Sequence, residues 1–183
     1  FLASLRILLV LLAIFMLTEG VLSVERTGLP VLAILVDDSA SERIVDQFSS
    51  PETKTKLETL AGGPANSESE PSRLSVAKGF LLKDQAALIR ELQKQHKVRL
   101  YQVSSSTRLF AKVDRPEEVE PTVASVKGLT PAGGQTRLGD GVRQVLTELR
   151  GSPPAALLLL SDGQTTDGEP LVKAAELATR KGV

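Results

Sequence analysis

The sequence is 183 residues long and carries 22 basic and 22 acidic residues, so its formal net charge is zero. A chain of this length has room for one sizeable domain and a short appendage. The balanced charge, the absence of tryptophan and the single tyrosine argue against a nucleic-acid-binding surface. Cysteine is absent and His96 is the only histidine, so disulfides, thiolate or histidine metal sites and Ser-His-Asp catalysis are not expected.

The chain starts with a strongly apolar segment. Residues 1–17 are nearly all apolar, and apolar residues continue at 21–24. About 20 such residues are needed to cross the hydrocarbon core of a membrane. Two interpretations stay open: a transmembrane helix or signal anchor over residues 1–25, and a signal peptide with residues 7–17 as its apolar region. Because the sequence does not begin with methionine, we favour the transmembrane helix, followed by a short linker at 26–30.

The rest of the chain, residues 31–183, is expected to form one domain that begins with a buried strand. Residues 31–36 are an unbroken run of valine, leucine, alanine and isoleucine, which is typical of a central parallel strand covered by helices on both faces. The run ends at Asp37, and Ser39 and Ser41 follow in a D-x-S-x-S spacing. Such oxygen donors suit Mg²⁺, Mn²⁺ or Ca²⁺. They are also ordinary loop and capping residues, so the interpretation as a cation site depends on later segments.

The later elements follow from apolar spacing and turn residues. In chain order they are a polar surface excursion at 49–72, one or two helices at 73–96 with a junction near Lys83 and Asp84, strands at 98–103 and 108–113, a polar helical or irregular segment at 114–126, a helix from Leu138 to Leu149, a second buried strand at 155–160 and an amphipathic helix at 169–181. This order predicts an α/β fold of three layers, doubly wound, with a mainly parallel sheet and helices on both faces. The sequence ends where a helix would lead into another strand, so we expect the domain to be truncated at its C-terminal end.

Two further segments carry polar residues of interest. The Gly-rich segment 128–139 contains Thr136 and has a G-x-x-x-x-G skeleton, but an aspartate and a glycine follow it where a phosphate-binding loop needs Lys-Ser/Thr. No G-x-G-x-x-G follows the first strand either, so we expect no nucleotide. Asp162, with Gly163 after it, directly follows the second predicted strand.

These three separated pieces together resemble the von Willebrand factor A domain and its metal-ion-dependent adhesion site. The resemblance covers about residues 29–183. It implies that a divalent cation, usually Mg²⁺, is held by Asp37, Ser39, Ser41, Thr136 and Asp162. It also implies an open position on the cation that a carboxylate of a partner protein fills. The apolar start resembles bacterial membrane-anchored members of the family, which implies a domain outside the cytoplasm and tethered to the inner membrane.

The sequence departs from the family pattern at Glu42, where a methionine often follows the second serine. This extra carboxylate could weaken or block an acidic partner, or point to solvent. Three further aspartates are interpreted as supporting or surface residues, because aspartate is common in Gly-rich turns without a function. They are Asp38, Asp140 and Asp167.

Two other functions stay open beside a membrane-tethered, cation-dependent protein-binding domain. One is a scaffold of the same fold with a vestigial metal site. The other is a Mg²⁺-dependent phosphohydrolase with Asp37 as nucleophile and Asp162 and Asp167 as metal ligands. That chemistry needs a second carboxylate two residues after the nucleophile, where Ser39 stands, so we do not expect an enzyme.

Overall fold

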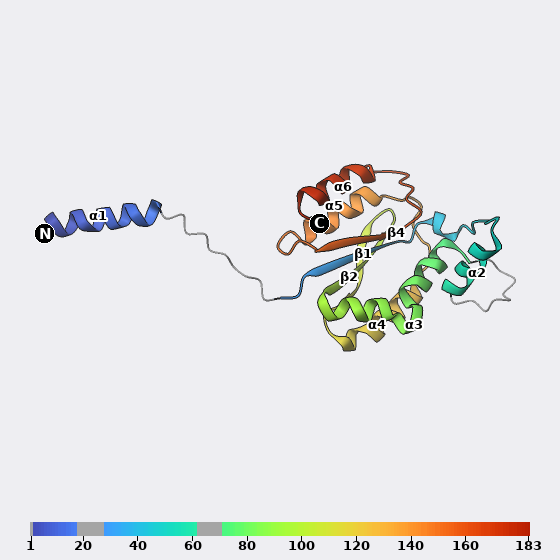
Figure 1. Cartoon of the computed structure of the whole chain (residues 1–183). Helices are drawn as coiled ribbons and strands as arrows, with labels where there is room; N and C mark the ends of the chain where they lie inside the picture. The colour runs from blue at the N-terminus through green and yellow to red at the C-terminus, as the bar shows by residue number, and fades with distance from the viewer. Residues whose placement is uncertain (1, 18–27, 62–70) are drawn as a thin grey trace.

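The computed structural model describes residues 2–17, 28–61 and 71–183 (Figure 1). Its elements in chain order are α1 (Leu2–Leu17), β1 (Val31–Asp37), the 3₁₀ helix η1 (Ala40–Arg43), α2 (Pro51–Leu60), α3 (Arg73–Gln95), β2 (Lys97–Val103), β3 (Thr107–Val113), the 3₁₀ helix η2 (Pro116–Glu118), α4 (Val119–Gly128), α5 (Leu138–Glu148), β4 (Ala156–Leu160) and α6 (Leu171–Arg180).

The four described strands form one sheet in the order β3-β2-β1-β4. Strand β1 pairs in parallel with both β2 and β4, whereas β3 is antiparallel to β2. The sheet is therefore mainly parallel, as the sequence predicts, and the strand predicted at 108–113 is the antiparallel edge neighbour. Because the three parallel strands point the same way, their carboxyl ends lie at one edge of the sheet, where α/β folds bind ligands.

Strand β1 lies at the centre of the hydrophobic core, and all of its residues are buried. Its side chains alternate between two cores, as the pleat of a strand requires. Leu32, Ile34 and Val36 pack with apolar residues of α3 and α4 on one face. Ala33 and Leu35 pack with those of α5 and α6 on the other face. This arrangement confirms the predicted layering, with helices on both faces of the sheet.

Strand β4 differs from the prediction of a second buried strand. Ala156 is exposed and the residues from Leu157 to Leu160 are only half-buried. The reason is its place in the sheet, because β4 pairs with β1 on one side and forms the edge of the described sheet on the other.

Helix α3 contains the break that the sequence predicts near Lys83 and Asp84. Four consecutive residues, from Lys83 to Ala86, leave helical geometry, and Asp84, Gln85 and Ala86 have φ values of 50°, 59° and 59°. Leu81, just before the break, and Ala86, its last residue, are both buried.

Helix α1 has 16 residues, and its Leu8, Leu9 and Val10 side chains are exposed. Among the residues that the structure describes, no helix combines the length and the hydropathy needed to span a membrane. Part of the apolar segment predicted to span, residues 18–25, lies outside the described ranges, as do residues 26 and 27 of the predicted linker.

Candidate metal centre

The D-x-S-x-S loop begins where β1 ends. The backbone N–H of Ser39 donates to Asp37 Oδ1 at 2.9 Å, and the hydroxyl oxygens of Ser39 and Ser41 share a hydrogen bond of 2.8 Å. Asp37 and Ser39 are almost fully buried, whereas Ser41 is half-buried. The loop therefore holds one carboxylate and two hydroxyls together, as the spacing in the sequence suggests.

The Gly-rich loop that carries Thr136 is bonded to the D-x-S-x-S loop. The Ala40 N–H donates to the Gly133 carbonyl at 2.7 Å, next to a bridge between Ser39 and Gly133. Thr136 is buried, and its N–H donates to Thr166 Oγ1 at 2.8 Å. These bonds place the loop of Thr136 between the first loop and the segment after β4.

Asp162 reaches the same edge because β4 pairs with β1 in parallel, with Val36 opposite Leu160. The neighbouring Ser161 hydroxyl donates to Asp37 Oδ2 at 2.9 Å and so helps to orient that carboxylate. Asp162 Oδ2 accepts a hydrogen bond of 2.5 Å from Arg73 Nη1. The same guanidinium donates twice to the Asp46 carboxylate, through Nε and Nη2.

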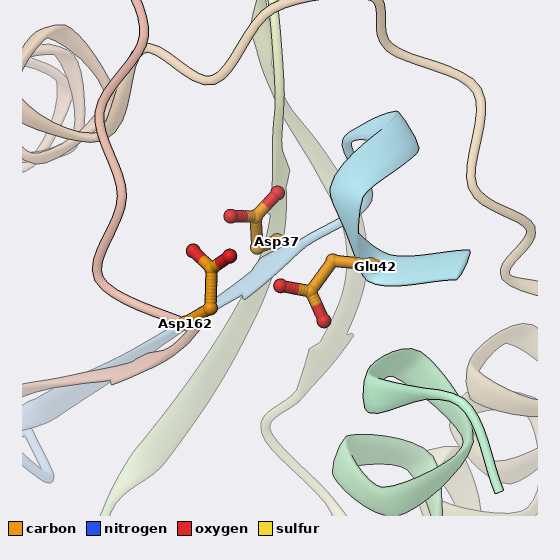
Figure 2. Close-up of side chains that lie close together, drawn as sticks. All are labelled: Asp37, Glu42 and Asp162. Carbon is orange, nitrogen blue, oxygen red and sulfur yellow. The ribbon is translucent and has the colours of Figure 1, made fainter. Parts of the chain in front are cut away.

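A third carboxylate, that of Glu42, turns toward Asp37 and Asp162 (Figure 2). Each of the three residues offers one oxygen, and these oxygens all lie within 4.8 Å of one another. Glu42 is only 3% exposed, and its Oε1 has no hydrogen-bond partner. Glu42 is not among the ligands that the family resemblance implies, although its departure from the family pattern marks this position in the sequence.

The pKa of Glu42 is raised from 4.5 to about 7, mainly by burial and also by the negative charges of Asp37 and Asp162. A hydrogen bond from the Asp162 backbone and the positive charge of Arg73 act in the opposite direction. The protein therefore holds a carboxylate in a place that disfavours its negative charge. A cation among the three carboxylates would reverse that preference.

The other aspartates of this region have different partners. Asp38 Oδ2 accepts a hydrogen bond of 3.0 Å from Gln102 Nε2, so this side chain faces β2. Asp140 and Asp167 both lie near Arg137 Nε, at 3.0 and 3.3 Å. These contacts agree with the interpretation of all three aspartates as supporting residues.

The donor set fits a hard divalent cation. The predicted ligands offer only carboxylate and hydroxyl oxygens, which Mg²⁺, Mn²⁺ and Ca²⁺ prefer. Oxygens bound to one such ion lie about 2.0–2.6 Å from it, so three oxygens within 4.8 Å of one another can share an ion. The unpartnered oxygen of Glu42 is a second indication, because a buried polar atom without a partner carries a desolvation cost.

A cavity of about 560 Å³ borders the acidic side chains. Glu42, Asp162 and Arg73 lie on its polar side. Its apolar side is lined mainly by side chains of α2 and α3, among them Leu57, Leu60, Val76 and Phe80. The candidate centre is thus next to a space that a group from another molecule can enter.

Comparison with protein-family models identifies the class of protein. The model of the von Willebrand factor type A domain matches residues 66–183, and the chain belongs to that family. The matched residues include Thr136 and Asp162 and begin after the D-x-S-x-S loop. A search of curated protein sequences gave no match.

Solved structures share the fold at low sequence identity. Proximal thread matrix protein 1 (PTMP1) from the mussel byssus has a TM-score of 0.52 and 18% identity, over 85% of this chain and 36% of that protein. A second structure of PTMP1, with a zinc-occupied MIDAS motif, has a TM-score of 0.51 and 16% identity, over the same shares of both chains. BatB from Bacteroides thetaiotaomicron has a TM-score of 0.52 and 17% identity, over 84% of this chain and 62% of that chain. This chain thus spans less than two thirds of these proteins.

Proposed function

We propose that this von Willebrand factor type A domain binds a protein partner through a divalent cation held by Asp37, Ser39, Ser41, Thr136 and Asp162. The observation that carries the proposal is the convergence of three loops at one sheet edge, where the Asp37 carboxylate is buried and bonded on both oxygens while the Asp162 carboxylate lies close by. Von Willebrand factor type A domains typically act as metal-dependent interaction modules and not as enzymes. The fold and the oxygen donors support that role here.

Mg²⁺ is the cation that we propose, with Mn²⁺ or Ca²⁺ as substitutes. The cation supplies a positively charged centre that can accept a carboxylate from a partner protein. The hydroxyls of Ser39, Ser41 and Thr136 contribute oxygens without a negative charge, so they leave much of the charge of the ion unneutralised. The bordering cavity gives an acidic group a route to the centre.

Cation binding should raise the melting temperature of the 183-residue chain. A ligand that binds only the folded state stabilises it by about 2.7 kcal/mol at a hundredfold excess over its dissociation constant. Asp37→Ala and Thr136→Ala should remove the shift produced by Mg²⁺ or Mn²⁺, because each removes a proposed ligand. Asp167→Ala, which removes an exposed aspartate near the same edge, should keep the shift. No shift in the unaltered protein would favour a scaffold with a vestigial site.

We also propose that α1 and the apolar residues after it tether the domain to a membrane, with the domain outside the cytoplasm. The exposed leucine and valine side chains of α1 support this, since a helix with no polar side is poorly accommodated in water. The apolar residues at 21–24 would extend the segment toward the length that a membrane requires.

Flotation with phosphatidylcholine vesicles tests the tether. The chain should float with the vesicles, and the double variant Leu8→Glu/Leu12→Glu should stay at the bottom of the gradient. Charged residues near the centre of a membrane helix cost about 2.5–3.5 kcal/mol each. Val172→Glu, at an exposed apolar side chain of α6, is the matched control and should float. Flotation of the double variant to the same extent would contradict a tether through α1.

A further inference from the structure

The carboxylate of Glu42 is buried, although a charged side chain on a short surface helix would normally face solvent. Glu42 lies on η1, directly after the D-x-S-x-S loop, and its side chain turns inward and not to solvent. Buried carboxylates are normally paired or bound to metals. Here Oε1 has no donor, and the nearby guanidinium of Arg73 gives its hydrogen bonds to Asp46 and Asp162. The described residues therefore leave this oxygen without a hydrogen-bond donor.

The direction of the Glu42 side chain shows where that partner belongs. One of its oxygens lies within 4.8 Å of oxygens from both Asp37 and Asp162 (Figure 2). Three ionised carboxylates this close repel one another, and a cation among them would offset that repulsion. The single positive charge of Arg73 is shared with Asp46, so the cluster keeps an excess of negative charge.

We propose that Glu42 is a direct ligand of the cation, and that it competes with the carboxylate of a partner protein for the same ion. This inference rests on the proposed function, since it assumes a cation between Asp37 and Asp162. It goes beyond that function because it gives the domain an acidic ligand of its own. A partner then has to displace Glu42 or bind an ion whose charge is already more fully neutralised.

Two measurable consequences follow. Loss of the Glu42 carboxylate should weaken cation binding by about tenfold or more, since even the loss of a group that only supports a metal ligand typically costs 10–100-fold. The freed position on the ion should fill with water, and a small carboxylate such as acetate should then bind there more readily. Purely electrostatic action by Glu42 would change the affinity without changing the number of bound waters.

Mn²⁺ is the best probe because its bound waters can be counted from the relaxation rate of bulk water protons. We would titrate Mn²⁺ into the 183-residue chain by calorimetry and count the waters on the bound ion. Glu42→Gln should bind Mn²⁺ more weakly, and the bound Mn²⁺ should carry more water than in the unaltered protein. Added acetate should displace that extra water in the variant. The unaltered protein should not respond to acetate. Glu176→Gln, at an exposed glutamate of α6, is the matched control.

A second variant separates ligation from charge. Glu42→Asp keeps the negative charge but shortens the side chain by one methylene, so direct ligation predicts extra water on Mn²⁺ in this variant also. Equal water counts in the unaltered protein, Glu42→Gln and Glu42→Asp would overturn the inference. If the water counts are equal but Mn²⁺ binds the unaltered protein and Asp37→Ala abolishes that binding, only the role of Glu42 is refuted. If the unaltered protein binds no Mn²⁺, the proposed function fails as well.

Discussion

Gly133→Ala should destabilise the protein by about 1–3 kcal/mol, the usual cost of overpacking, and should also abolish cation binding. A Cβ atom at this position would lie 2.1 Å from Ser104 Cβ and 2.4 Å from Ser104 Oγ. Ser104 is buried, so it has little room to move away. The loop would have to shift, and with it the backbone bond from Ala40 to Gly133 that joins the two candidate ligand loops. Urea unfolding and the Mg²⁺-induced melting shift would measure the two effects.

The adjacent glycine provides the control. A Cβ atom at Gly134 would meet no atom within 4 Å, so Gly134→Ala should change the free energy of unfolding by no more than about 0.5 kcal/mol. It should also keep the melting shift. Equal losses of stability and of the melting shift in the two variants would contradict this explanation. They would show that the loop needs flexible glycines in general and not a close approach between Gly133 and Ser104.

In the absence of cations, Glu42→Gln should make the protein more stable at about pH 8. The pKa of Glu42 is raised from 4.5 to about 7 in the folded protein, so the folded state binds this proton more tightly than the unfolded state does. The stabilising effect of the proton is complete below about pH 4.5 and is lost as the pH rises to about 7. That loss corresponds to at most about 3 kcal/mol, and the glutamine variant should not show it.

Urea unfolding in the presence of a chelator would measure this difference at a series of pH values. The gain in the free energy of unfolding from Glu42→Gln should be largest above about pH 7. It should nearly disappear at about pH 4, where the glutamate and the glutamine are both neutral. Glu176→Gln should follow the unaltered protein at every pH. A glutamine variant that is less stable at high pH would mean that the charged carboxylate has a favourable partner in the absence of a cation.

Much of the fold could be predicted because its signals are local. The unbroken apolar run at 31–36 identified the central strand, and the alternation at 98–103 identified its neighbour. The position of the candidate site also followed from local information, since polar residues after parallel strands meet at one edge. The D-x-S-x-S loop and the residue after β4 are indeed joined there, through Ser161 and Asp37.

The features of the fold and of the candidate site that the sequence does not predict depend on contacts between distant segments. Leu157 to Leu160 are as apolar as a central strand, but their exposure is set by the number of neighbouring strands. The direction of the Glu42 side chain is set by the turn of η1, which brings residue 42 back over the end of β1. The close approach of Gly133 to Ser104 joins segments that no local pattern connects.

The complete burial of β1 also has a kinetic consequence. Strands that are paired on both sides and buried along their length usually exchange their amide hydrogens only when the whole domain unfolds. Asp37 is the last residue of such a strand. The anchor of the candidate centre therefore belongs to the part of the chain that opens last, so local opening of α2 or α6 would leave the Asp37 carboxylate in place.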